Sequence, residues 1–374
     1  MKTSLSTLFF VLFLTLSSCN AQEHGPKIET PKEKRYTHEI VADSIAIPWG
    51  LSFITPEDFL VTEKSGIMYR VTQGNKTEVN GLPPVYVRGQ GGLLDVAIAP
   101  DFETTNTVYF TTSSPLGEEK GGHTALYAAE LEGYNLTNTR LLYKGDYNTK
   151  KGQHWGSRIA FDNAGHLYFS IGDRGNREVN PQDITRDGGK IYRLNLDGSI
   201  PEDNPFVNQA DSRKAIYSYG HRNPQGMITH PETGQIWVHE HGPRGGDEIN
   251  VIEPGKNYGW PEITYGINYS GTPITDKTEM DGMQQPLYYW VPSIASSGMA
   301  FSTSDIYPEW KGNLFVGSLA FQYLERLVIK NNTVVKREKI LDSLGRVRNV
   351  EEGPDGYLYA GVEGVGIVKI LPKK

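Results

Sequence analysis

The sequence predicts an all-β protein, a six-bladed β-propeller, on three observations. Glycine and tyrosine are abundant, with 41 and 21 residues in a chain of 374. Few stretches have the apolar spacing of a long helix. A unit made of a short strand, a turn with Pro or Asp and Gly, and an alternating strand recurs six times. Such repeats are typical of blades arranged around a central channel.

The six units follow one another from residue 49 to residue 361. Their paired strands are expected, in chain order, at 49–53 and 59–62, 94–100 and 108–111, 157–162 and 166–173, 225–231 and 236–238, 297–301 and 313–317, and 348–354 and 357–361. Unequal spacing between the units places long insertions at 174–215 and 257–296. We expect these loops to lie on one face of the propeller and to build the site.

The first 18 residues have the character of a targeting segment. A positive charge at Lys2 precedes an apolar run from Leu8 to Leu16 that is too short to span a bilayer. The run ends in Leu-Ser-Ser-Cys19, which resembles a bacterial lipobox, and Cys19 is the only cysteine of the chain. We therefore expect a lipoprotein signal peptide at 1–18 and a lipid anchor on Cys19, in the periplasm or cell envelope and favouring the outer membrane. The alternative is an ordinary secretory signal with an incidental cysteine.

Charge and composition limit which partners the mature chain can have. Removing residues 1–18 removes one basic residue, so 37 − 1 = 36 basic residues face 44 acidic ones, a net charge of −8. This balance argues against nucleic acid and anionic membrane surfaces as partners, apart from the lipid on Cys19. Residues 19–44 are polar and read as a tether, and 45–374 is long enough for one domain with a large core.

The stretch from Glu240 to Asn250 is the most informative polar segment. It follows a strand-like run and opens a loop with Gly242 and Pro243, and the acids Asp247 and Glu248 come directly after. Backbone carbonyls and carboxylates are the hard oxygen ligands that calcium prefers. Together with the string 220–226 upstream, this segment indicates a site for a cation and an anionic ligand at the rim of the fold.

Other polar residues gather where the repeat units begin, beside the expected channel. They are Gln90, His154, Arg222, Asn223, Gly242, Pro243, Arg346 and Arg348. Arg346 and Arg348 alternate, so an extended backbone directs both side chains to the same side. Two guanidinium groups on one side suit carboxylates or phosphates. A solvated or salt-bridged edge is the alternative for this pair.

From about 45 to 371 the chain resembles the soluble quinoprotein aldose sugar dehydrogenases of the glucose/sorbosone dehydrogenase family, which use pyrroloquinoline quinone (PQQ). The resemblance rests on five strings of the sequence, at 89–94, 170–173, 220–226, 240–250 and 254–261. The fold of that family is a six-bladed propeller, in agreement with the repeat count. The resemblance implies oxidation of aldoses at C1 to aldonolactones, with PQQ and Ca²⁺ as cofactors and an external electron acceptor.

The resemblance also implies catalytic and substrate-binding roles for individual residues. His154 matches the general base that takes the proton of the anomeric hydroxyl while a hydride moves to C5 of PQQ, a task that suits imidazole. Asp173 matches a carboxylate that orients this histidine. Gln90 matches a contact to substrate and cofactor, and Gln153 stands where some members have Asp, which bears on substrate preference.

Cofactor and metal contacts follow from the same resemblance. Arg222 and Asn223 match contacts to the quinone, where positive charge stabilises the reduced oxyanion, which makes Arg222 a catalytic candidate as well. The carbonyls of Gly242 and Pro243 match ligands of the calcium that PQQ binds. Arg346 and Arg348 match clamps on the PQQ carboxylates. Glu248 and Tyr258 match ligands of a second, structural calcium, the tyrosine through its carbonyl.

One departure from the family pattern bears on the cofactor. Ala320 stands where members usually carry a PQQ-contacting lysine, and alanine cannot replace a cation. Two alternative functions remain open: a sugar-binding lipoprotein without PQQ, which Ala320 favours, and a metal-dependent propeller lactonase, which needs one calcium held by several side-chain acids and amides. A zinc site at His239 and His241 is a weaker alternative, because no third ligand is evident.

Overall fold

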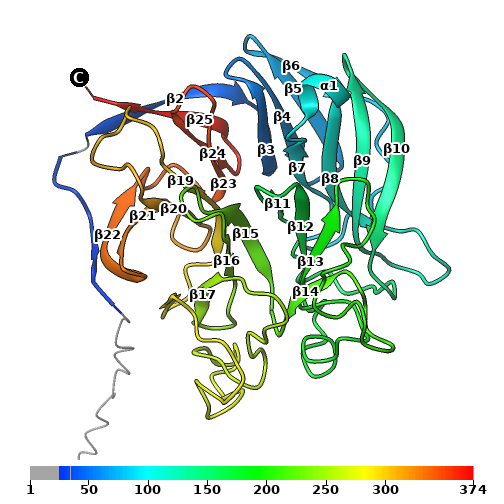
Figure 1. The fold of residues 1–374 in the computed structure, drawn as a ribbon. Helices are drawn as coiled ribbons and strands as arrows, with labels where there is room; N and C mark the ends of the chain where they lie inside the picture. Colours follow the sequence, from blue (N-terminus) through cyan, green and yellow to red (C-terminus); the bar gives the residue numbers. More distant parts are fainter. Residues whose placement is uncertain (1–24, 34, 374) are drawn as a thin grey trace, which may run out of the picture.

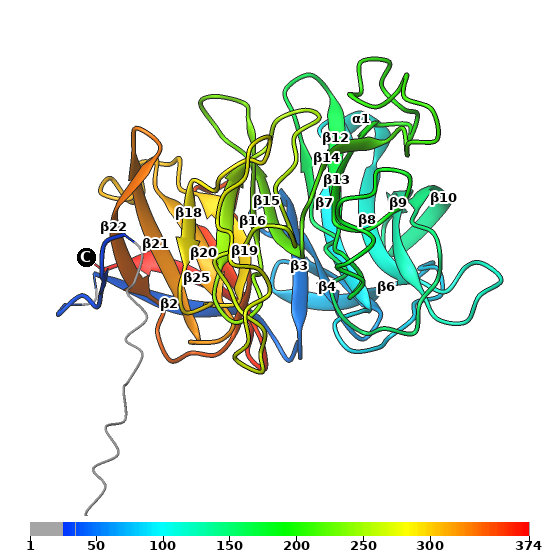
Figure 2. The same ribbon diagram turned by 90° about the horizontal axis from the view of Figure 1, so that it is seen from below.

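Six β-sheets arranged in a ring make up nearly all of the regular structure (Figure 1). The computed structural model describes residues 25–33 and 35–373. Within them only one short helix occurs, α1 (Phe102–Thr105). Figure 2 turns the ring on its side. The prediction of an all-β, six-bladed propeller is confirmed.

Each blade contains four antiparallel strands, and its innermost strand lies next to the channel. The strands of the first three blades are β3 (Pro48–Thr55), β4 (Asp58–Glu63), β5 (Ile67–Thr72) and β6 (Asn75–Val79); β7 (Leu93–Ile98), β8 (Thr107–Ser114), β9 (His123–Glu132) and β10 (Asn135–Lys144); β11 (Ile159–Phe161), β12 (His166–Ile171), β13 (Lys190–Asn195) and β14 (Ile216–Tyr219).

The second half of the ring has the same organisation. Its strands are β15 (Pro224–Thr229), β16 (Ile236–Glu240), β17 (Asp247–Val251) and β18 (Tyr288–Trp290); β19 (Ser296–Phe301), β20 (Leu314–Ser318), β21 (Tyr323–Lys330) and β22 (Thr333–Ile340); β23 (Val347–Glu352), β24 (Leu358–Val362) and β25 (Gly366–Pro372), with β2 (Tyr36–Asp43) as the outer strand of the last blade.

The repeat units found in the sequence coincide with the first two strands of every blade. The two predicted insertions are not wholly loop, because 174–215 contains β13 and 257–296 contains β18. Both still supply long connections. Apolar side chains fill the space between blades, as where Leu60 and Met68 of the first blade pack with Val108 and Phe110 of the second.

Residues 36–43 form a strand that closes the ring, so the predicted polar tether over 19–44 is wrong for this part of the segment. β2 pairs antiparallel with β25, so the two ends of the chain share one sheet. β1 (Ile28–Glu29) pairs parallel with β22 of the neighbouring blade. Backbone pairing stabilises this polar segment, because strand pairing satisfies N–H and C=O groups that the edge of β25 would expose. The predicted signal peptide and Cys19 lie outside the described residues. The described residues include no helix that is long and apolar enough to cross a membrane.

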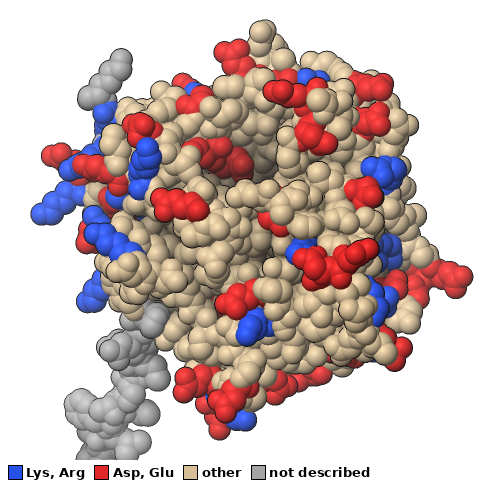
Figure 3. Space-filling model, in the orientation of Figure 1, with Lys and Arg blue, Asp and Glu red and all other residues tan. Residues whose placement is uncertain are grey.

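The channel is closed part of the way along by the side chain of Arg158, which precedes β11. Its Nη1 donates to Oδ1 of Asp95 at 2.9 Å, and its guanidinium lies 4.2 Å from the ring centroid of Trp49. The remaining donors reach backbone carbonyls of three other blades, those of Trp49 at 3.2 Å, Gln225 at 2.8 Å and Arg348 at 3.0 Å. Figure 3 shows a hollow in the middle of the ring with acidic side chains at its edge.

We expect Arg158→Met to lower the free energy of unfolding by about 3–5 kcal/mol, because it leaves the buried carboxylate of Asp95 without its counter-charge. Urea denaturation followed by tryptophan fluorescence measures the change. Arg35→Met is the matched control, because the Arg35–Glu309 pair is 74% and 66% exposed. That control should change stability by less than about 1 kcal/mol. Equal effects of the two substitutions would contradict a central role for Arg158.

Candidate active site

A histidine–carboxylate pair lies at the end of the channel where the inner strands begin. His154 precedes β11 and Asp173 follows β12, and His154 Nδ1 lies 2.6 Å from Asp173 Oδ1. Trp260 Nε1 donates to Asp173 Oδ2 at 2.9 Å, and the backbone N–H of Gly175 donates to Oδ1 at 2.6 Å. Because a carboxylate only accepts, Nδ1 carries the proton and Nε2 is left with a free lone pair.

Burial and the charge of Arg222 keep the histidine neutral. Burial lowers the pKa of His154 below its ordinary value, and the nearby charge of Arg222 lowers it further, against the opposing effect of Asp173. Burial alone raises the pKa of Asp173, but His154 and Arg222 outweigh it and the carboxyl stays ionised. A neutral imidazole held by an ionised carboxylate is the arrangement of a general base.

Interlocked glycine loops set the position of His154. Gln90 accepts from the backbone N–H of His154 through Oε1 at 2.7 Å, and its own N–H donates to the carbonyl of Gly152 at 2.7 Å. A Cβ on Gly91 would lie 2.6 Å from the indole of Trp155, so the two loops approach this closely only with glycine there. The structure therefore brings Gln90 to His154.

A cavity of about 300 Å³ opens beside the pair. The residues that line it are His154, Asp173, Gly175, Asn176, Arg177, Glu178, Arg222, Pro243, Trp260, Asn268 and Tyr269. The long connections after β12 and β17 supply most of this wall, as the insertions in the sequence predicted. Gln90, Gln153, Asn223 and the two arginines of the last blade are not part of its lining.

Arg222 and Asn223 lie in the string 220–226, directly before β15, and each has one buried donor without an acceptor. Arg222 Nη1 donates to the carbonyls of His241 at 3.1 Å and Gly242 at 2.8 Å, whereas its Nε is buried without an acceptor. Asn223 Oδ1 accepts from the N–H of Gly156 at 3.1 Å, and its Nδ2 is likewise buried without an acceptor. Buried donors without acceptors are costly, so both fit a ligand rich in oxygen.

Hydrogen bonds to the buried carboxylate of Asp247 hold the loop of Gly242 and Pro243 in place. Asp247 Oδ1 accepts from the N–H of Gly242 at 2.9 Å and from the hydroxyl of Ser293 at 2.6 Å. Burial raises the pKa of Asp247 to about 6. The Gly242 carbonyl, expected as a calcium ligand, accepts from Arg222 and keeps one lone pair, whereas Pro243 lines the cavity.

Glu248 and Tyr258 line a second, very small cavity of about 10 Å³, together with Glu240. Burial raises the pKa of Glu248 to about 8, and the charge of Glu240 adds to the effect. The Tyr258 hydroxyl donates to the carbonyl of Val251 at 2.6 Å, and no backbone N–H of the described residues donates to the carbonyl of Tyr258 itself. Two facing carboxylates in a space the size of one water or ion fit a cation.

The oxygen atoms that could bind a cation in that small cavity come from both side chains and backbone. Across residues 25–33 and 35–373 no three His, Cys, Asp or Glu side chains group as metal ligands. A cation there therefore needs backbone oxygens beside the carboxylates. His239, considered for zinc, instead directs Nε2 at the carbonyl of Gly298 at 3.1 Å.

Arg346 and Arg348 reach the same side, as their alternation predicted, and both bind one carboxylate. Arg346 Nε donates to Glu363 Oε2 at 2.7 Å, and Arg348 Nη2 donates to Oε1 at 2.6 Å. Arg346 Nη1 also donates to the carbonyl of Leu319 at 3.1 Å, which places the exposed Ala320 next to this arginine pair. Glu363 thus occupies the kind of position that a ligand carboxylate would take.

Three residues at the site had no role in the sequence interpretation. Trp260 stood in the recognised string 254–261 without a function, and Glu240 opened the metal-like segment without being chosen as a ligand. Tyr269, which is 74% exposed, lies in a long connection with no motif. Gln153 lies on the surface with its carbonyl bound by Arg174, and the structure brings it beside Gly175.

The family model described as Glucose / Sorbosone dehydrogenase matches residues 45–368. The aldose sugar dehydrogenase YliI of Escherichia coli (strain K12) is 39% identical over 328 residues, covering 86% of this chain and 88% of that protein.

Two solved structures are also similar. The soluble aldose sugar dehydrogenase of Escherichia coli, in its apo form, superposes with a TM-score of 0.85 at 37% identity, covering 90% of this chain and 100% of the other. The PQQ-bound aldose sugar dehydrogenase of Streptomyces coelicolor gives a TM-score of 0.73 at 27% identity, covering 92% and 99%. With a family match over most of its length and a propeller that carries the His154–Asp173 pair, this chain belongs to the glucose/sorbosone dehydrogenase family.

Proposed function

We propose that this protein is an oxidoreductase that oxidises aldose sugars at C1 to aldonolactones, with PQQ and calcium as cofactors and an external electron acceptor. The observation that carries the proposal is the neutral His154 held by the ionised Asp173 in a cavity that Arg222 also lines. The names of the similar proteins, which include aldose sugar dehydrogenases and a PQQ-bound structure, support it.

The residues of the cavity have separate tasks in this reaction. PQQ, when bound, would serve as the acceptor of the hydride that leaves C1 of the sugar. His154 Nε2 takes the proton of the anomeric hydroxyl, and loss of this proton together with the hydride makes C1 a carbonyl carbon. Asp173 stabilises the imidazolium that results, and Trp260 and the Gly175 N–H hold Asp173 in place. Arg222 supplies positive charge and an unpartnered donor next to the reacting groups.

The chain offers matching groups for both cofactors. Arg346 and Arg348 would hold carboxylates of PQQ, as they hold that of Glu363. Glu240, Glu248 and the Tyr258 carbonyl would hold a structural calcium, and Pro243 would contribute near the cofactor. The lactonase alternative requires several acids and amides around one channel cation, whereas this cavity presents a histidine–aspartate pair and arginines. Anchoring through Cys19 remains part of the proposal.

We expect His154→Ala to lower turnover by about 10²–10⁴-fold while PQQ affinity stays nearly unchanged, because only the base is removed. Steady-state kinetics with an aldose and an artificial acceptor, and PQQ titration, measure the two effects. In the wild type, the base is active when neutral, and its pKa is lowered. The rate should therefore fall only as the pH falls below about 6.5. His38→Ala, on the exposed face of β2, is the control. Unchanged turnover of the PQQ-bound His154 variant would refute the role.

Calcium should stabilise the protein through Glu248. Saturation at 100 times the dissociation constant adds about 2.7 kcal/mol, and magnesium should add less because it demands a rigid six-oxygen shell. In EDTA, a raised pKa means that folded Glu248 keeps a proton that the unfolded chain loses. Stability should then fall as the pH rises from about 4.5 to about 8.

Glu248→Gln separates these effects. In EDTA, the stability of the variant should depend less on pH than that of the wild type, and near pH 8 the variant should be the more stable of the two. Calcium should add little to its stability. Thermal melts with and without calcium provide the measurement, and Glu253→Gln, an exposed acid nearby, is the control. If calcium stabilises the Glu248 variant as much as the wild type, the assignment of this ligand is wrong.

Ala320→Lys should tighten PQQ binding by about ten- to a hundredfold, because one charge-assisted hydrogen bond contributes roughly 1.5–3 kcal/mol. Absorbance or calorimetric titration of the metal-loaded protein with PQQ measures the dissociation constant directly. Ala164→Lys adds the same charge in the turn between β11 and β12 and should leave the constant unchanged. Absence of PQQ binding in every variant would favour the sugar-binding or lactonase alternative.

A further inference from the structure

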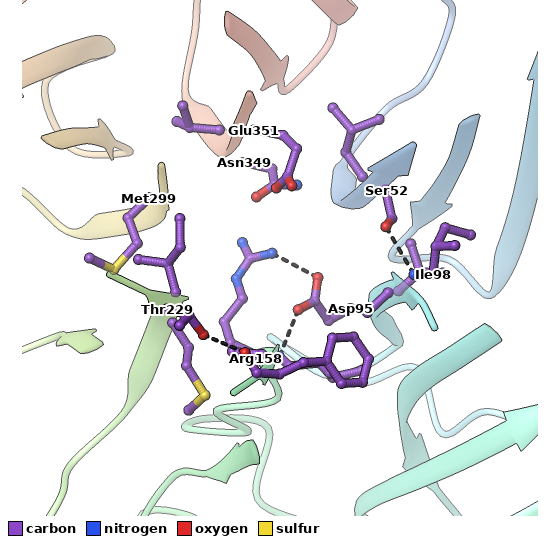
Figure 4. A pocket seen from close by; sticks show the side chains of 17 residues that line it. Ser52, Asp95, Ile98, Arg158, Thr229, Met299, Asn349 and Glu351 are labelled. Atoms are coloured by element: carbon purple, nitrogen blue, oxygen red, sulfur yellow. Dashed lines mark hydrogen bonds and ion pairs between the residues drawn. The ribbon is translucent and has the colours of Figure 1, made fainter. Parts of the chain in front are cut away.

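Another cavity, of about 290 Å³, occupies the channel on the other side of Arg158 (Figure 4). Its lining comes from the inner strands of all six blades. Candidate active-site residues precede these strands, as Asn223 precedes β15, whereas the cavity is lined by later positions such as Thr229. Because a strand rises about 3.3 Å per residue, the cavity lies at the opposite end of the channel from His154.

The ion pair in this cavity is internally satisfied. Asp95 accepts from Arg158 Nη1 through Oδ1 at 2.9 Å and from the Ile159 N–H through Oδ2 at 2.9 Å. Arg158 directs its other donors at backbone carbonyls. Neither side chain has a charge left to balance, so the pair forms the floor of the cavity.

Two other polar side chains of the cavity have no such partners. Asn349 and Glu351 lie two residues apart on β23, and Figure 4 shows them side by side in the cavity. Asn349 is only 4% exposed, yet no described residue forms a hydrogen bond with its side chain or with that of Glu351. The adjacent Glu352, in contrast, accepts from the N–H of Thr303 at 2.7 Å and from its hydroxyl.

The surroundings make a lone Glu351 carboxylate unfavourable. Burial raises the pKa of Glu351 to about 8, and the charges of Asp95 and Glu352 add to this while Arg158 opposes it. The parts of β3, β15 and β19 that line the cavity contribute no charge. Without a counter-ion Glu351 therefore holds a proton at neutral pH, and a cation in the cavity would favour its ionised form.

We propose that this cavity binds a small organic cation through an ammonium group held by Glu351 and Asn349. An ammonium ion has three donors and no acceptor, which suits the carboxylate oxygens and the amide Oδ1. The thioether side chains of Met227 and Met299 line the same cavity and contact the hydrocarbon part. Calcium fits less well, because it needs six to eight oxygen ligands and the side chains of Glu351 and Asn349 offer only three. Binding releases the proton of Glu351 to the buffer. The proposal is independent of sugar oxidation.

Calorimetric titration of the full mature protein with n-butylammonium chloride tests the site. We expect saturable 1:1 binding and, at pH 7, release of close to one proton, read from the heats in buffers of different ionisation enthalpy. Affinity should rise about tenfold from pH 6 to pH 7 and level off above about pH 8, where Glu351 is already ionised. Glu351→Gln should weaken binding at pH 8 at least tenfold, whereas Glu352→Gln should retain it.

Thermal melts test whether the Glu351→Gln variant is folded, and their pH dependence measures the effect of the Glu351 proton on stability. The raised pKa means that wild-type stability falls between about pH 4.5 and 8, so the variant should match the wild type at pH 5 and melt higher at pH 9. The proposal is overturned if n-butylammonium does not bind, if Glu351→Gln binds it as tightly, or if 1-butanol binds equally well. Glu351-dependent binding of calcium chloride or glucose in its place would make the cavity a metal or sugar site, which also overturns it.

Discussion

The buried guanidinium of Arg158 holds the centre of the ring together. Its partners are a carboxylate and backbone carbonyls on the inner strands of four other blades. The Arg348 carbonyl that it binds also accepts from Ser297 of the fifth blade at 2.8 Å, so every blade is joined at this point. A propeller has no core that crosses its axis, and a single side chain with five donors supplies that link.

The same side chain divides the channel into two different environments. On one side, the segments that precede the inner strands bring His154, Arg222 and their partners to one cavity. On the other side, the strands themselves line a cavity whose unpaired groups are Asn349 and Glu351. Arg348 connects the two, because its carbonyl bonds to Arg158 while its side chain belongs to the predicted cofactor clamp.

Carboxylates of the protein itself pair with the positively charged groups and hydrogen-bond donors of the site. Glu363 joins Arg346 and Arg348, Glu240 accepts from His221 at 2.8 Å and from the Arg222 N–H at 2.5 Å, and Asp247 shapes the Gly242 loop. These anions fix the orientation of arginines and backbone before any ligand binds, which reduces the entropy lost on binding. Glu248 is different, since its facing neighbour Glu240 is another acid, and a cation between the two would favour its ionised form.

The sequence alone determined the six blades and the places where polar residues gather. Each blade is a local pattern of alternation and turns, so its first two strands are visible within about 25 residues of chain. The His154 and Asp173 strings, the alternating arginines and the metal-like loop were local as well. Only the tertiary structure decided that β2 closes the ring, that Trp260 holds Asp173, and that Glu363 and Arg158 bind where they do. These contacts join residues far apart in the chain, 87 positions for Trp260 and Asp173 and 190 for Arg158 and Arg348. Pairings over such distances depend on how the blades are arranged around the channel, which no short-range pattern encodes.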